Sequence, residues 1–326
     1  MIITKTPLRM SFAGGGTDIR DYYQHGYGSV VSTTINKYVY INVNKRFTDK
    51  IRIGYSQIEY VDNVEDIQHN LIREILKLAQ VTKGIEVVYM SDMLPAHEGS
   101  GLGASSSIIV GTLNALHAYK GEHASAKTLA EEACKIEIDI LKHPIGKQDQ
   151  YAAAYGAFNY IKFTSDESVF VNPIVLKKEF REELNNNLLL FYTDINVRSD
   201  TILTEQKIKT KDNLQILDKM VELCEQLREA LESRDLTEFG TILHKGWLYK
   251  QKLASNITNS AIDLYYEKAI KAGAIGGKIL GSGGGGFLLL YCEKKNQDNV
   301  RRALSNLKEV PFSFEQQGSK IIYIND

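Results

Sequence analysis

The sequence predicts an α+β protein built from two domains. Two observations carry this prediction: strand-like and helix-like segments mix in both halves of the chain, and 326 residues are enough for two hydrophobic cores. The character of the chain changes near residue 180, beyond which helical segments dominate. We therefore predict one domain over residues 1–178 and a second over residues 179–326.

In the predicted first domain, the apolar pattern indicates strands followed by helices. The stretch "GSVVSTTINKYVYINVNKRF" alternates and is rich in Val, Ile, Thr and Tyr, which is typical of sheet. A further strand is expected at 84–92. Helices are expected over 65–80, from the glycine-rich loop at 97–107 to about Tyr119, and over 125–141, because apolar residues recur there at helical spacing.

In the predicted second domain, strands flank a long helical region. "NNLLLFYTD" has the length and composition of a buried strand, and long helices are expected over 199–272. "GGKILGSGGGGFLLLYC" then reads as a strand, a glycine loop and a second strand. A helix at 296–307 and a last strand, "KIIYIND", complete the predicted domain.

The composition narrows the class of protein. The formal net charge is −1, so the surface as a whole gives no electrostatic reason to bind nucleic acid or an anionic membrane. Cys134, Cys224 and Cys292 are odd in number and far apart, which favours reduced thiols and a cytoplasmic protein. The densest apolar runs, "NLLLFY" and "FLLLYC", are far too short to cross a bilayer.

The loop "HEGSGLGASSS" at 97–107 is the first candidate for chemistry. A glycine-rich turn that leads into a helix presents free backbone N–H groups, and the helix dipole adds positive potential there, so the loop favours phosphate. It is not a Walker loop, because the chain contains no Gly-Lys-Ser/Thr tripeptide. It is not a dinucleotide fingerprint either, because another helix follows where a strand ending in an acidic residue is required. The alternative is a flexible loop with a serine N-cap.

Two more glycine clusters interrupt strand-like sequence, "SFAGGGTD" at 11–18 and "LGSGGGGF" at 280–287. Glycine inside a strand usually marks a bulge or the close approach of a ligand or another backbone. One such cluster can be a plain turn, but three beside predicted sheet suggest loops that converge on one pocket. Arg9 and Asp18 flank the first cluster, and a surface ion pair explains both equally well.

Glu137 lies along the edge of the apolar stripe of the helix predicted at 125–141. A carboxylate that faces the interior needs a cation or strong hydrogen bonds. A metal site and a buried ion pair with a lysine or arginine are equally good readings of this position. The stripe itself consists of Leu129, Ala133, Ile136 and Ile140.

Asp149, in "GKQDQY", is a second candidate carboxylate. Transfer of a phosphoryl group to a hydroxyl needs a carboxylate that accepts or orients the hydroxyl proton. The alternative is a helix N-cap, a role that an Asp before "QYAAAY" would fill well.

Taken in order, these pieces resemble the GHMP small-molecule kinases. "TPLRMSFAGGGTDIRDYY", "EGSGLGASSS" and "KILGSGGGGF" are similar to the three signatures of that family, and the match covers nearly the whole chain. The resemblance implies an N-terminal ribosomal-protein-S5-like domain and a C-terminal ferredoxin-like domain. It also implies ATP and Mg²⁺ as cofactors.

The resemblance assigns roles residue by residue. Asp149 matches the catalytic aspartate and Arg9 an arginine near the transferred phosphate. Ser105 and Glu137 match the ligands of Mg²⁺. The usual loop has serine where this chain has Ala104, so one hydroxyl to the phosphates is missing. The residues that would bind ATP are Gly99, Ser100, Gly101, Leu102, Gly103, Ala104, Ser105 and Ser106. Those that would bind the acceptor are Gly15, Gly16, Thr17, Asp18, Lys147, Arg198, Gly283 and Gly284.

Within the family, the likeness is to members that phosphorylate a heptose phosphate. It implies transfer of the ATP γ-phosphoryl group to the anomeric hydroxyl of D-glycero-D-manno-heptose 7-phosphate, giving the 1,7-bisphosphate for GDP-heptose synthesis. Lys147 and Arg198 are candidates to hold the substrate phosphate, although Arg198 pairing with Asp194 or Asp200 is an equal alternative. A kinase of another sugar such as fucose, and a non-catalytic sugar and ATP sensor, stay open, as does a homodimer.

Overall fold

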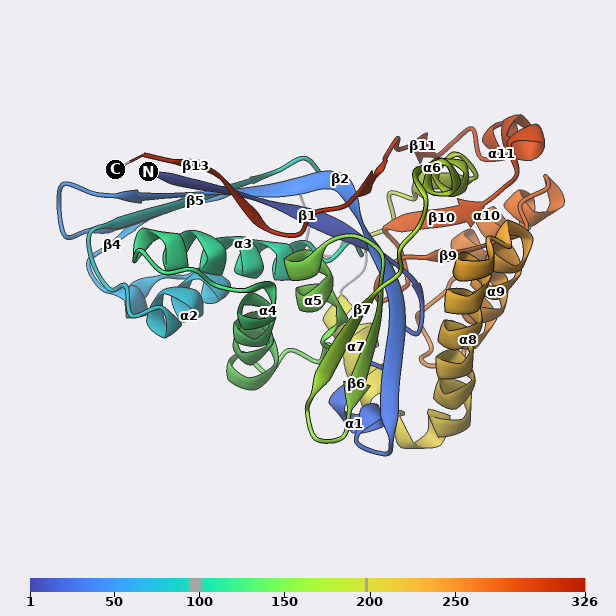
Figure 1. Ribbon diagram of the computed structural model, residues 1–326, viewed down its shortest axis with the longest axis horizontal. Coiled ribbons are helices and arrows are strands. Elements are labelled where there is room, and N and C mark those ends of the chain that lie inside the picture. The colour runs from blue at the N-terminus through green and yellow to red at the C-terminus, as the bar shows by residue number, and fades with distance from the viewer. Residues whose placement is uncertain (94–100, 197–198, 326) are drawn as a thin grey trace.

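The computed structural model describes residues 1–93, 101–196 and 199–325, which form two sheets with helices packed on them (Figure 1). The first sheet has the strand path β13-β1-β2-β5-β3-β4, with β6 and β12 also paired to β2 and β7 paired to β6. Its strands are β1 (Ile2–Ala13), β2 (Tyr27–Lys45), β3 (Ile51–Gly54), β4 (Ile58–Val61), β5 (Ile85–Ser91), β6 (Asn159–Thr164), β7 (Val169–Pro173), β12 (Phe314–Glu315) and β13 (Lys320–Ile324).

The long strand β2 is the spine of this sheet. It pairs antiparallel with β1 and β6 along its first part and with β1 and β5 along its second part. Its Val, Ile and Thr residues fit a strand with one face against a core, and residues 28–35 are buried throughout. All pairings in the sheet are antiparallel except that of β3 with β5. The predicted sheet of the first domain is therefore confirmed.

Helices cover the face of this sheet that looks downward in Figure 1. The central helix α3 packs on β1 and β2, with Ile109, Leu113 and Leu116 buried as the apolar spacing predicts. Gly121, with φ of +75°, lies just past the end of α3 and takes the left-handed conformation that glycine tolerates best. The helices of this layer are α1 (Arg20–Tyr23), α2 (Asn70–Leu78), α3 (Ala104–Tyr119), α4 (Ala126–Cys134) and α5 (Gln148–Tyr155).

The helix predicted at 125–141 differs from a regular α-helix in its last turn. Ser125 caps α4 by accepting a hydrogen bond from the N–H of Thr128 at 3.1 Å. A π-helical segment, Lys135–Ile140, then follows directly. This wider turn shifts the register, so that Ile140, expected in the buried stripe, is 40% exposed.

The second half of the chain builds a four-stranded antiparallel sheet in the order β11-β8-β10-β9. Helices α8 and α9 lie between the two sheets, since α8 packs on β1 and β2 and α9 on β9 and β1. The elements are α6 (Lys178–Asn186), β8 (Leu188–Tyr192), α7 (Ser199–Ile208), α8 (Leu214–Ser233), α9 (Leu236–Lys250), α10 (Ser260–Lys271), β9 (Gly276–Ile279), β10 (Phe287–Tyr291), α11 (Gln297–Ala303) and β11 (Lys308–Glu309).

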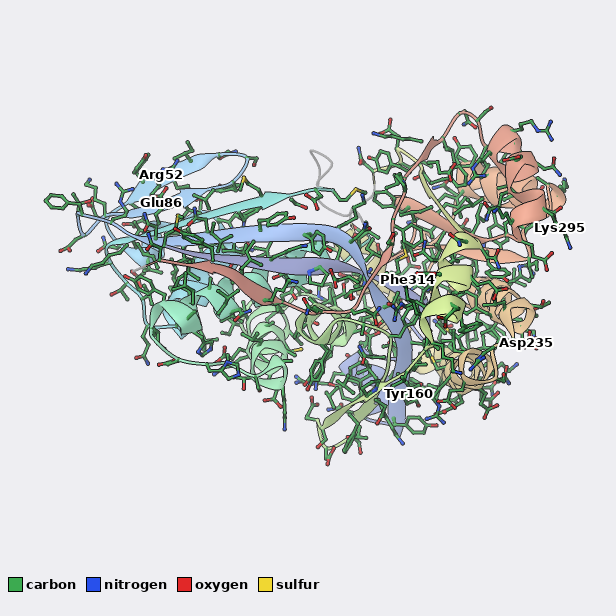
Figure 2. The ribbon with its side chains drawn as sticks, turned by 45° about the horizontal axis from the view of Figure 1, so that its top comes forward. Arg52, Glu86, Tyr160, Asp235, Lys295 and Phe314 are labelled. Atoms are coloured by element: carbon green, nitrogen blue, oxygen red, sulfur yellow. The ribbon has the colours of Figure 1, made fainter. Side chains whose placement is uncertain are left out.

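The predicted division at residue 178 needs one correction. The chain leaves the first sheet there, at the start of α6, but its last two strands return to that sheet. β12 pairs with β2 and β13 with β1, and Figure 2 shows Phe314 at the junction of the two halves. A pattern of apolar residues marks a strand but not its distant partner, so the return could not be predicted. No helix in the described ranges is long and apolar enough to span a membrane.

Candidate active site

Arg9 and Asp149 form an ion pair at the centre of the candidate site. The Nε and Nη2 groups of Arg9 donate to the two carboxylate oxygens of Asp149, each at 2.7 Å. The Arg9 side chain is 5% exposed and that of Asp149 is 22% exposed. Such two-pronged pairs are strong and fix the orientation of both groups. Arg9 therefore pairs with Asp149, and the alternative of a surface pair with Asp18 is wrong.

The same arginine is tied to the phosphate loop. Its backbone N–H donates to the carbonyl of Leu102 at 3.0 Å, and its Nη1 group donates to the carbonyl of Gly101. A Cβ atom at Gly103 would lie 3.1 Å from Cγ of Arg9 and 3.3 Å from Oδ2 of Asp149. The described end of the predicted phosphate loop thus lies directly against the ion pair.

Asp149 does not cap its helix. Helix α5 begins at Gln148 and its N-cap position is Lys147, which makes no side-chain capping bond. Asp149 is the second residue of the helix, and its carboxylate turns to Arg9. The capping alternative is therefore wrong, and the carboxylate is held at the surface of the site.

Glu137 is fully buried, as its place on the apolar edge predicts. Its Oε2 atom accepts hydrogen bonds from the hydroxyl of Ser106, at 2.6 Å, and from the side-chain amide of Gln150. Burial raises the pKa of Glu137 to about 7, while the bonds from Ser106, Gln150 and Ser105 oppose that rise. The partners are neutral, so the alternative of a buried ion pair is not what the structure shows.

This carboxylate fits a divalent cation. Its Oε1 atom is buried and has no hydrogen-bond partner among the described residues, which is costly for a carboxylate unless a cation approaches. Hydroxyls of Ser105 and Ser106 lie beside it, and Mg²⁺ prefers hard oxygen ligands with one or two carboxylates and substrate phosphates. No group of three or more His, Cys, Asp or Glu suited to a metal occurs in the described ranges, so the phosphates of a nucleotide would have to complete the set.

The glycine cluster at 11–18 carries Asp18 into the interior. Oδ1 of Asp18 accepts from the N–H of Gly16 at 2.9 Å, and Oδ2 accepts from the N–H of Gln148 at 3.1 Å. Burial raises the pKa of Asp18, and the bond from Gly16 opposes the rise. The hydroxyl of Thr17 instead donates to the carbonyl of Ser29 and accepts from its N–H, so it secures the loop to β2.

Lys147 is already paired. Its ammonium donates to the carboxylate of Glu167 and lies 5.0 Å from the ring centroid of Tyr23. The sequence predicted Lys147 as a candidate to bind the substrate phosphate. The structure shows it paired with Glu167, a carboxylate that Arg20 also contacts, and its role toward a substrate stays a prediction. The predicted partner residue Arg198 lies outside the described residues.

The predicted convergence of glycine loops occurs at Gly101 and Gly281. A Cβ atom at Gly281 would lie 2.4 Å from Cα of Gly101, so the two backbones touch. Gly283 and Gly284 lie elsewhere: the N–H of Gly284 donates to the carbonyl of Ile257 at 2.7 Å. The third cluster thus reaches the phosphate loop through Gly281 and not through the two glycines predicted to contact substrate.

The phosphate loop itself is described from Gly101 onward, and Gly99 and Ser100 lie outside the described residues. Helix α3 begins with Gly103 as its N-cap, at φ of +74° and without a side-chain capping bond. The alternative of a serine N-cap is therefore wrong. The hydroxyl of Ser106 donates to Glu137, and Ser105, in the first turn of α3, is an exposed residue whose hydroxyl lies beside the same carboxylate.

Sequence reasoning missed three polar residues near this site, Gln150, Lys250 and Lys278. Each left a signal. Lys278 is a lone lysine within the buried strand β9, "GGKI". Lys250 continues the buried stripe of α9 after Leu243 and Trp247. A charged residue inside an apolar pattern is the informative exception to hydrophobic burial.

Comparison with known proteins decides the family. The model of the GHMP kinases N terminal domain matches residues 67–157, and that of the GHMP kinases C terminal domain matches residues 227–309. A relative from Campylobacter jejuni, D-glycero-alpha-D-manno-heptose 7-phosphate kinase, is 31% identical over 98% of each chain. The chain belongs to the GHMP kinase family. As a GHMP kinase it is a phosphotransferase, and the family uses ATP as phosphate donor.

Two further similar proteins are also sugar kinases. The solved structure of a D-glycero-D-manno-heptose 1-phosphate kinase from Bacteroides thetaiotaomicron has a TM-score of 0.82 and 26% identity, covering 100% of both chains. The L-fucokinase/L-fucose-1-P guanylyltransferase of Bacteroides fragilis is 26% identical over 89% of this GHMP kinase but only 34% of its own length. The likeness to these enzymes confirms the predicted family and fold.

Proposed function

We propose that this kinase transfers the γ-phosphoryl group of ATP to the anomeric hydroxyl of D-glycero-D-manno-heptose 7-phosphate, giving the 1,7-bisphosphate. One observation carries the proposal: the Arg9–Asp149 pair lies against residues 101–103 of the phosphate loop, in a chain 31% identical to a heptose 7-phosphate kinase. A carboxylate and a guanidinium beside a phosphate-binding helix end are the parts that phosphoryl transfer to a hydroxyl requires.

In this mechanism Asp149 accepts or orients the proton of the C1 hydroxyl. Arg9 holds that carboxylate in place through two hydrogen bonds, and its guanidinium stabilises negative charge that develops on the transferred group. A side chain at Gly101 would collide with the backbone of Leu280, and one at Gly103 would crowd Arg9. Glycine at both positions keeps the loop close to these residues and leaves its backbone open to the phosphates. Asp18, buried beside Gln148, is the candidate acceptor for sugar hydroxyls.

Glu137 and Ser105 would hold the Mg²⁺ ion that accompanies ATP, with Ser106 orienting the carboxylate. When bound, the ion would neutralise charge on the phosphate oxygens. The unpartnered Oε1 atom of Glu137 supports this assignment. Ser105 occupies the first turn of α3, where its hydroxyl is accessible to a nucleotide.

The position of the substrate's own phosphate is part of the proposal. The Campylobacter jejuni relative is named for a heptose 7-phosphate, whereas the Bacteroides thetaiotaomicron structure is named for a heptose 1-phosphate. We choose the 7-phosphate as substrate because the relative that bears that name shares more of the sequence. The product would serve GDP-heptose synthesis in the cytoplasm, and a homodimer is compatible with the proposal.

A bare sugar such as fucose is the second candidate acceptor, since the fucokinase of Bacteroides fragilis matches 89% of the chain. An ADP-release assay with Mg²⁺ and ATP separates the two. The panel comprises D-glycero-D-manno-heptose 7-phosphate, sedoheptulose 7-phosphate, fucose, mannose and galactose. Turnover with the aldoheptose phosphate alone supports the proposal. Turnover with fucose alone would overturn the substrate, and ATP binding without any turnover would favour a sensor.

A further inference from the structure

Two buried lysines lie beside the glycine cluster at 11–18 and have no role in the mechanism above. Lys250, the last residue of α9, is 5% exposed, and Lys278, in β9, is 7% exposed. Lysine is almost never this buried unless it is paired with a carboxylate. Lys147 satisfies that rule through Glu167, but these two do not.

The partners of the two ammonium groups are all neutral. Nζ of Lys250 donates to the carbonyl of Gly15 at 3.3 Å and to Oε1 of Gln206 at 3.0 Å. Nζ of Lys278 donates to the carbonyls of Ser11, at 2.8 Å, and Phe12, at 3.4 Å. An ammonium has three N–H donors, so each lysine keeps one beyond these bonds among the described residues.

The charges nearby do not balance. Arg9 and Asp149 neutralise each other, which leaves Asp18 as the carboxylate that attracts both Lys250 and Lys278. Burial lowers the pKa of Lys250 to about 8 and that of Lys278 to about 7, and the charge of Lys250 further lowers the pKa of Lys278. If both lysines are ionised, these five groups carry one net positive charge in a desolvated place, and a bound anion would offset the cost of ionising them.

Gln206 gives an independent sign of a ligand. It is 2% exposed, its Oε1 atom is taken by Lys250, and its Nε2 donor has no partner among the described residues. A Cβ atom at Gly16 would lie 2.4 Å from that Nε2 atom, so the donor lies against the glycine loop. The hydroxyl of Ser11 is likewise buried and unpartnered in the described ranges. A phosphate, with several acceptor oxygens, fits such a set of donors.

We infer that Lys250, Gln206 and Lys278 form a subsite for a phosphate group, the one that the acceptor sugar carries into the site. The inference rests on the proposed function, and it assigns recognition of the substrate's phosphate to the second half of the chain. It also gives the kinase a means to prefer a sugar phosphate to a bare sugar. The γ-phosphate of ATP has the same chemistry, and the test below separates the two sources.

The test is isothermal titration calorimetry without turnover. Its ligands are D-glycero-D-manno-heptose 7-phosphate, the unphosphorylated heptose and a non-hydrolysable ATP analogue. The wild type should bind the phosphorylated sugar about tenfold or more tightly than the bare one, since bonds to charged groups contribute that much. Lys250→Met should remove most of this preference and leave the Kd of the bare heptose within about threefold. Lys245→Met, the same change at an exposed position of α9, should keep it.

Gln206→Glu gives a second, nearly isosteric variant that does not depend on the folding of Lys250→Met. A carboxylate at this position would pair with Lys250 internally and compete with the ligand, so the preference for the phosphorylated sugar should again fall about tenfold. If Lys250 only joins α9 to the glycine loop, Gln206→Glu should stabilise the fold and leave the preference unchanged, which would overturn the inference.

Three other outcomes would overturn it as well. They are equal wild-type affinity for the two sugars, an equal loss for both sugars in Lys250→Met, and a loss confined to the ATP analogue. Because binding is measured without chemistry, the result is independent of turnover. A wild type that prefers the sugar phosphate yet never releases ADP would refute the proposed function and still support the subsite.

Discussion

Arg9 donates to both carboxylate oxygens of Asp149 at 2.7 Å and donates through its third nitrogen to the carbonyl of Gly101. One buried guanidinium thus joins the candidate base to the phosphate loop. Because its orientation is set from both sides, a change of Asp149 should alter the chemistry more than the binding of the nucleotide.

Asp149→Asn should lower kcat by on the order of a hundredfold or more with little change in the Kd of ATP, since the amide cannot accept the hydroxyl proton. Steady-state kinetics and nucleotide titration measure the two quantities. Asp139→Asn, an exposed carboxylate of the preceding segment, is the matched control and should be near wild type. Near-full activity of Asp149→Asn would refute the assigned role.

Glu137→Gln should raise the Mg²⁺ concentration for half-maximal activity by roughly tenfold or more, because the variant keeps the size of the side chain but loses a charged ligand. Titration of the variant with Mn²⁺, followed by electron paramagnetic resonance, should show the same loss of affinity in the presence of ATP. An unchanged metal requirement would place the cation elsewhere.

Gly281→Ala should raise the KM for ATP by roughly tenfold, because the new methyl group would lie 2.4 Å from Cα of Gly101 and force the two loops apart. Gly121→Ala is the matched control, since its φ of +75° resembles the +76° of Gly281 but nothing lies within 4 Å. The control should lose some stability and keep its KM. Equal KM values for both variants would show that the close approach is not needed for ATP.

Lys278 should impose a pH dependence on stability. Its pKa is lowered from 10.5 to about 7 in the folded protein, so the unfolded chain binds more protons between those values. The free energy of unfolding contributed by this residue should therefore rise as the pH rises from about 7 to 10. Urea denaturation of the wild type and Lys278→Met at pH 7 and pH 9.5 measures the difference. The free energy of unfolding of the wild type, relative to that of Lys278→Met, should be larger at pH 9.5 than at pH 7. The variant Lys308→Met, changed at an exposed position, should show no such trend.

Arg198→Ala tests the sequence-based assignment of a residue that the structure does not describe. If Arg198 binds the substrate's phosphate together with the subsite at Lys250, the variant should raise the KM for a sugar phosphate severalfold and leave the KM for a bare sugar unchanged. Equal effects on both acceptors would instead indicate the alternative pairing with Asp194 or Asp200.

Local signals were sufficient for most of the fold. The start of α4 after Ser125, the end of α3 at Tyr119 and the alternation in β2 depend on neighbours in the chain, and each is where the sequence predicts it. The hairpin of β3 and β4 was missed because its four-residue strands are short and partly exposed. Arg52 holds it to Glu86 of β5, a contact visible in Figure 2.

The sequence predicted which residues form the site better than it predicted which residues they contact. The burial of Glu137 followed from helical spacing, but the partners of Arg9 and Lys147 depend on segments that meet only in the folded chain. The π-helical turn before Leu141 could not be predicted either, because its wider hydrogen bonding leaves no periodic signal in six residues. The burial of Lys250 and Lys278 could have been predicted, because each is a charged residue within an otherwise apolar segment.

The proposed reaction is phosphoryl transfer from ATP to the anomeric hydroxyl of a heptose phosphate. Its most direct test is nuclear magnetic resonance of the reaction of the wild type with Mg²⁺, ATP and D-glycero-D-manno-heptose 7-phosphate. We expect a new phosphorus signal coupled to the anomeric proton, formed one-to-one with ADP and absent with Asp149→Asn. ADP release without a new anomeric phosphate, or an unchanged sugar phosphate beside bound ATP, would contradict it.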